Sequence, residues 1–106
     1  MTLVGGISRN QDLESGHECW FPVPVTAIPY GKPVLVNKIN VALVGNVTAV
    51  HVCGDKPPHI DKIITGSKKV WVNKKMVARI GDKLQSLGAG GTALMAQGSH
   101  SVIAGG

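Results

Sequence analysis

A sequence segment that occurs twice, with small changes, is the feature that most constrains the fold of this chain. Residues 32–46 read KPVLVNKINVALVGN, and residues 68–84 read KKVWVNKKMVARIGDKL. An offset of 36 residues aligns the two phrases. The identical pairs include Val34/Val70, Val36/Val72, Asn37/Asn73, Lys38/Lys74, Val41/Val77, Ala42/Ala78 and Gly45/Gly81. So many identities at one offset indicate an internal structural repeat.

Halves of the same unit appear at the two ends of the chain. The final residues, GSHSVIAGG (98–106), match the front half of the unit, and ISRNQD (7–12) matches its back half, VARIGD. A chain that begins with a back half and ends with a front half completes a third unit when its two ends lie side by side. Most internal repeats form solenoids or propellers. Three short units that close on themselves predict instead an approximate internal threefold axis and a compact, tapering, all-β object.

Each unit has the pattern of a β-hairpin. In the second unit Val70 and Val72 face one side of a strand and Trp71 faces the other, by the two-residue period of a strand. Asn73 then stands where a tight turn needs a positive φ, which Asn tolerates. Lys74 follows where Gly would fit better, at a cost of about 1–2 kcal/mol if Lys is left-handed.

Three apolar residues stand at equivalent positions of the three units, namely Leu35, Trp71 and Ile103. If the threefold axis is present, these side chains form one apolar ring. The ring is either ordinary core or an exposed base that docks on a partner, since contiguous apolar patches mark interfaces.

The histidines and cysteines form two clusters that suit a metal ion. His17 and Cys19 are two residues apart, His51 and Cys53 are two residues apart, and His59 follows six residues later. Positions i and i+2 of an extended chain project to the same side, so each pair can offer two ligands to one point. Imidazole and thiolate ligands together favour Zn²⁺, with iron the less favoured metal. The leading ligand set is the three histidines with Cys53, and Cys19 is the alternative fourth ligand.

Composition and charge narrow the functional classes. The 106 residues suit one domain, spanning 1–106, and the net charge of +5 is spread along the chain without interleaved aromatics. A zinc-stabilised nucleic-acid-binding module therefore remains only an alternative function. No Gly-rich phosphate loop and no nucleophile–base–carboxylate set is present, and Glu18 alternates away from the predicted metal, so we expect no enzyme. His100 lies inside the third hairpin and is interpreted as a surface residue.

The start of the chain has no charged-then-apolar signal-peptide pattern. We therefore expect the protein to be made and folded in the cytoplasm. Cysteines in that compartment are rarely paired, so we expect a metal or free thiols in place of a disulfide.

The repeated motifs resemble those of the PAAR-repeat family. Gly-Ser, Val-x-Val-Asn, Ala-Arg and Gly-Asp follow one another from Gly66 to Asp82, and the Pro-Ala-Ala-Arg motif reads Met76-Val77-Ala78-Arg79 here. The family's opening SGHxC matches residues 15–19, and its central VHxC with a following His matches residues 50–59. The resemblance covers nearly the whole chain, residues 7–105.

The resemblance implies a small cone of three β-hairpin repeats, closed by the N- and C-termini and pinned by a metal ion, usually zinc, near its tip. Such cones cap the trimeric β-helical spike protein of a contractile injection machine, either a phage tail or a type VI secretion system. The expected function is therefore that of a structural tip, a monomer on a trimeric platform. It would touch the target membrane transiently, need no nucleic acid, and be assembled at the end of the spike.

The chain departs from the family pattern at two kinds of position. The motif proline is Met76 in one unit and Asn40 in the other. Many family members carry a Cys ligand after the last Gly-Asp, where this chain has Ser86 nearby. The fourth ligand is therefore expected to be Cys53 or Cys19.

Overall fold

Short β-strands make up all the regular structure of the described chain. The computed structural model describes residues 5–17, 20–54, 56–87 and 91–106, and none of these residues is helical. Accordingly, this part of the chain holds no helix long and apolar enough to cross a membrane. The body measures 39 × 31 × 22 Å along its principal axes. The all-β class expected from the sequence is therefore observed.

The strands are mostly two or three residues long, as dense Gly and Pro would favour. In chain order they are β1 (Gly5–Gly6), β2 (Val25–Thr26), β3 (Leu35–Val36), β4 (Ile39–Asn40), β5 (Val47–Thr48), β6 (His51–Cys53), β7 (Lys56–Ile63), β8 (Trp71–Val72), β9 (Lys75–Met76), β10 (Lys83–Leu87), β11 (Thr92–Leu94) and β12 (Ile103–Ala104).

The largest sheet forms the body of the molecule around β7. Its strand order is β11-β10-β7-β5-β2, and β6 also pairs with β7. Alternate residues of β7 are buried, namely His59, Asp61 and Ile63, because successive side chains of a strand point to opposite faces. The register sets Asp61 opposite Ser86 and Ile63 opposite Leu84 on β10. One face of β7 therefore carries polar side chains toward one end and a core residue toward the other.

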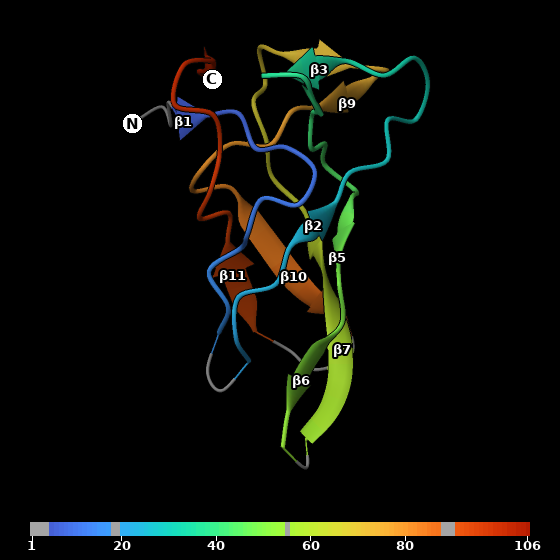
Figure 1. Cartoon of the computed structure of the whole chain (residues 1–106), viewed down its shortest axis with the longest axis vertical. Helices are drawn as coiled ribbons and strands as arrows, with labels where there is room; N and C mark the ends of the chain where they lie inside the picture. The colour runs from blue at the N-terminus through green and yellow to red at the C-terminus, as the bar shows by residue number, and fades with distance from the viewer. Residues whose placement is uncertain (1–4, 18–19, 55, 88–90) are drawn as a thin grey trace.

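Three two-stranded sheets lie at the opposite end from the β6–β7 hairpin (Figure 1). They pair β3 with β4, β8 with β9, and β1 with β12. The last of these pairs joins the first and last strands of the chain, so the two ends of the described chain lie side by side. Gly5 is opposite Ala104, and Gly6 is opposite Ile103.

The turns of the two hairpins have the backbone conformation predicted from the repeat. Asn37 and Lys38 have φ values of 54° and 67°, and Asn73 and Lys74 have φ values of 50° and 67°. Two central residues with positive φ define the type I′ turn, whose twist matches that of the flanking strands. Lysine is held left-handed in both turns, at a cost of about 1–2 kcal/mol each.

A closed ring of backbone hydrogen bonds joins three segments of the chain. Ser8 N–H donates to the Ala78 carbonyl, Ala78 N–H to the Ala42 carbonyl, and Ala42 N–H to the Ser8 carbonyl, each at 2.9 Å. The flanking residues pair in the same cyclic order, in the bridges Ile7/Arg79, Arg9/Val41 and Leu43/Val77. The three segments that the repeat aligns therefore contact one another pairwise.

The same turn follows each of these three segments. A side-chain oxygen accepts a hydrogen bond from the backbone N–H three residues earlier, at 2.7–2.8 Å. The three acceptor and donor pairs are Asp12 with Arg9, Asn46 with Leu43, and Asp82 with Arg79. An Asp or Asn at the same position of each segment thus marks a repeated turn, since Asp and Asn side chains bond readily to nearby backbone.

Two apolar clusters form the core. One contains Ile7, Val36, Val41, Leu43, Val77 and Ala104, and the other contains Val25, Ala42, Ile63, Ala78, Leu84, Ala93 and Met95. Small residues at the ring, Ala42 and Ala78, are fully buried, which lets the backbone segments approach one another closely.

The apolar side chains at equivalent positions of the three small sheets are not core. Leu35, Trp71 and Ile103 are 56%, 55% and 63% exposed. Their exposure rules out the core interpretation of these residues and leaves an apolar surface at the end opposite the β6–β7 hairpin.

Candidate metal centre

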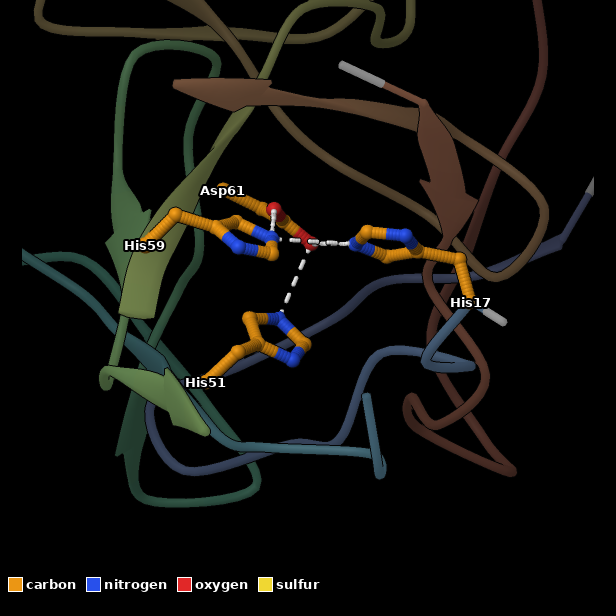
Figure 2. Close-up of side chains that lie close together, drawn as sticks. All are labelled: His17, His51, His59 and Asp61. Carbon is orange, nitrogen blue, oxygen red and sulfur yellow. Dashed lines mark hydrogen bonds and ion pairs between the residues drawn. The ribbon is translucent and has the colours of Figure 1, made fainter. Parts of the chain in front are cut away.

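Four side chains that could hold a metal ion converge in the interior (Figure 2). They are His17, His51, His59 and Asp61, and one ligand atom from each lies within 4.8 Å of the others. His51 begins β6, His59 and Asp61 belong to β7, and His17 comes from the segment before Trp20.

Strand geometry positions three of these four residues. The register of β6 and β7 sets His51 directly opposite His59, and cross-strand neighbours have adjacent side chains. Asp61 stands two residues after His59, so both side chains project to the same buried face. The preceding residues, Lys56 to Pro58, are exposed.

His17 reaches the same point from outside the sheets, at its bridge to Trp20. Its backbone exchanges hydrogen bonds with Trp20, at 3.1 Å and 2.9 Å. The Trp20 ring, which is buried, lies 5.0 Å from the His17 ring and 4.7 Å from the His59 ring, centre to centre. The indole therefore forms an apolar wall beside two of the imidazoles.

The spacing of the ligand atoms matches a small cation. The Nε2 atoms of His17 and His59 are 3.1 Å apart. Asp61 Oδ2 lies 3.0 Å from His51 Nε2 and 3.6 Å from His17 Nε2, and Asp61 Oδ1 lies 3.2 Å from His59 Nε2. Tetrahedral ligands at zinc bond lengths stand about 3.3 Å from one another. The three imidazoles each turn the same nitrogen, Nε2, toward the carboxylate.

Buried atoms at this point lack hydrogen-bond partners. Both oxygens of Asp61 and the Nε2 atom of His51 make no hydrogen bond, and their contacts are ion pairs only where an imidazole is protonated. Both residues are fully buried. A buried carboxylate without compensation costs several kcal/mol. A cation bound among these atoms would remove that cost, so the donor set of three imidazoles and a carboxylate fits a divalent metal.

Ser86 lies at the edge of the cluster but does not form a catalytic triad. Its hydroxyl is 3.1 Å from His17 Nε2 and 3.3 Å from His59 Nε2. A Ser–His–Asp triad joins serine and aspartate to the two different nitrogens of one imidazole. Here Asp61 and Ser86 both lie near the Nε2 atom of each of these two imidazoles, which is the arrangement of groups that surround one point.

Two groups of the centre have shifted pKa values. Burial, together with the nearby Asp61 carboxyl, raises the pKa of Glu14 to about 7, although the backbone N–H donors of Val23 and Gly16 oppose the rise. Burial also lowers the pKa of His59 below its ordinary value, with the charges of His51 and His17 adding to the effect and Asp61 opposing it. His59 is therefore held in the neutral form that a metal ligand requires.

The structure brings the three histidines of the leading ligand set together, but it does not add Cys53 to them. Cys53 is disulfide-bonded, which corrects the expectation of unpaired cysteines. A disulfide sulfur carries no thiolate charge, and thiolate is the form that binds metal. Cys19, the alternative fourth ligand, lies outside the described residues. His100 is exposed, as expected.

The acidic residue of the cluster was missed in the sequence. Asp61 stands two positions after His59, the same spacing that singled out the His-x-Cys pairs. Applying that rule to carboxylates as well as to thiols would have found it.

Neither protein-family models nor curated protein sequences identify a relative of this chain. The functional argument therefore depends on the repeat, the fold and the candidate metal centre.

Proposed function

We propose that the protein is a PAAR-like structural tip, which caps a trimeric β-helical spike of a contractile injection machine in a phage tail or a type VI secretion system. The observation that carries this proposal is the closed ring of backbone hydrogen bonds among Ser8, Ala42 and Ala78. A single chain with three equivalent segments around such a ring has the symmetry needed to sit on the blunt end of a trimer.

The surface beyond the ring supports a docking role. Leu35, Trp71 and Ile103 are each more than half exposed and stand at equivalent positions of three small sheets. Contiguous apolar surfaces are typical of interfaces, and we propose that these three side chains form one. The proposed occupant is the trimeric spike, because a true threefold axis would present the same contact to each of the three side chains.

The other end of the molecule supports a mechanical role. The β6–β7 hairpin projects away from the small sheets (Figure 1). The candidate metal centre lies on this hairpin at the paired residues His51 and His59. We propose that Zn²⁺ binds there and ties His17 to the two strands. Structural zinc sites contribute roughly 10–16 kcal/mol in small domains, so the ion would keep a thin tip folded under load.

Assembly with a spike tests the proposal. The protein is co-expressed with the trimeric β-helical spike protein encoded in the same genome. The mass of the complex, and hence its stoichiometry, is measured by native mass spectrometry. We expect one copy of this chain per spike trimer. A Trp71→Asp variant should lose the complex, because a charge replaces an apolar contact at the proposed interface.

The matched control is Val52→Asp, since Val52 is 66% exposed but lies on the β6–β7 hairpin. This variant should bind the trimer as the unchanged protein does. No complex with the trimer, or equal binding by both variants, would contradict the proposed docking surface.

A further inference from the structure

Glu14 is a buried carboxylate that neither the repeat nor the four-residue cluster accounts for. It is fully buried, although acidic side chains are almost never so without a partner. Its backbone is held by two neighbouring β-bridges, in which Leu13 pairs with Pro24 and Glu14 pairs with Met95. The side chain therefore enters the interior from a different segment than β6 and β7.

One oxygen of Glu14 is fixed, and the other is not satisfied. Oε1 accepts hydrogen bonds from the backbone N–H of Gly16 at 2.9 Å and of Val23 at 3.0 Å. Oε2 is buried with no hydrogen-bond partner and lies 3.6 Å from His51 Nε2. The two backbone donors hold the carboxylate in place, so Oε2 stays directed at the nitrogen that His51 turns toward Asp61.

The charges of the centre also call for a second carboxylate ligand. With the three imidazoles neutral, Asp61 alone leaves a bound divalent cation with one uncompensated positive charge in a buried site. Glu14 supplies the second negative charge and brings the total to zero. Buried charges are tolerated where they are compensated in this way.

We propose that Glu14 is a further ligand of the metal centre, so that the ion has three imidazole and two carboxylate ligands and a coordination number above four. This inference rests on the metal centre of the proposed function. It assigns to the centre a coordination number that a tetrahedral structural zinc site does not have, and which Zn²⁺, Fe²⁺ and Co²⁺ can all adopt.

Cobalt substitution tests the assignment, because the visible absorption of Co²⁺ reports its coordination geometry. Metal-free protein is titrated with Co²⁺ and its spectrum is recorded. We expect the weak bands of five- or six-coordinate Co²⁺ in the unchanged protein. In Glu14→Gln, which keeps Oε1 as an acceptor for Gly16 and Val23, the bands should become several-fold more intense as the ion becomes four-coordinate.

The control is His100→Ala, which removes an exposed imidazole that lies outside the cluster. Its Co²⁺ spectrum should match that of the unchanged protein. Intense tetrahedral bands in the unchanged protein, or identical spectra with and without Glu14→Gln, would overturn the assignment.

Two further outcomes, a variant that does not fold and a protein that binds no metal, are also informative. If circular dichroism shows that Glu14→Gln does not fold, the spectrum of the unchanged protein alone decides the coordination number. If no Co²⁺ or Zn²⁺ binds to the unchanged protein, the metal centre itself is refuted, and the spike-docking surface is still judged separately by the trimer stoichiometry.

Discussion

Asp61 Oδ1 lies 3.2 Å from His59 Nε2, and the two residues stand two positions apart on the same strand. The pair therefore presents a nitrogen and an oxygen to one point with no contribution from any loop. Because β7 is the longest strand of the described chain and pairs with β10, β5 and β6, this half of the centre is held by the most extensively paired element. Among the four residues of the cluster, His17 is the one that lies outside the named strands.

The first prediction concerns metal content. Purified protein should contain one metal ion per chain by elemental analysis. Changing His51 or Asp61 to Ala should abolish binding, since both are fully buried ligand candidates. His100→Ala should retain the full metal content, because His100 is exposed and outside the cluster. Full retention of metal by a triple variant of His17, His51 and His59 would refute the centre.

Asp61→Asn should have opposite effects on the free energy of unfolding in the two metal states. In the metal-loaded protein the change removes an anionic ligand and should lower stability. In the metal-free protein it removes a buried charge whose oxygens lack hydrogen-bond partners, so it should raise stability. Calorimetric melting with and without a chelator measures both effects. The same direction of change in both states would contradict the assignment of Asp61 as a ligand.

Removing strain at a hairpin turn should stabilise the protein. Lys74 has a φ of 67°, which a glycine adopts without the steric cost that a side chain brings. We expect Lys74→Gly to raise the free energy of unfolding by about 1 kcal/mol, measured by chemical denaturation. Lys75→Gly is the control, since Lys75 lies in β9 and glycine weakens a strand. Destabilisation by both changes would show that the left-handed turn is not strained.

The backbone ring should not accept larger side chains. Ala78 is fully buried within the ring, so Ala78→Leu has to displace backbone and should destabilise by about 1–3 kcal/mol or more. Ala49→Leu, at an exposed position, provides the control and should change stability by less than about 0.5 kcal/mol. Thermal melting compares the two, and equal tolerance would mean that the ring is not closely packed.

The repeat allowed more of the fold to be predicted than composition would. The Asn-Lys turns follow from a local rule, because only a few residues tolerate positive φ, and the observed angles at Asn37 and Asn73 agree with it. The pairing of β10 with β7 and β11 did not follow from the repeat, since Lys83–Leu87 has no counterpart in the first phrase. Long-range pairing outside the repeated unit has no local signal.

The candidate site was predicted in part. His17, His51 and His59 were found because histidine is rare in this chain and clusters at short spacings. Cys53 was misjudged because the oxidation state of a cysteine depends on which sulfur atoms the fold brings together, and spacing alone does not report that. Asp61 and Glu14 were missed because carboxylates are common on surfaces, and only burial distinguishes these two from solvated ones.

The pairing of Gly5–Gly6 with Ile103–Ala104 has a consequence for biosynthesis. Ile103–Ala104 is synthesised long after Gly5–Gly6, so the emerging polypeptide carries an unpaired strand edge until Ile103–Ala104 has been translated. Contacts between such distant positions also form slowly. Joining the two ends with a short linker and opening the chain at the Asn37–Lys38 turn would convert this late step into an early one, and such a circular permutant should refold faster.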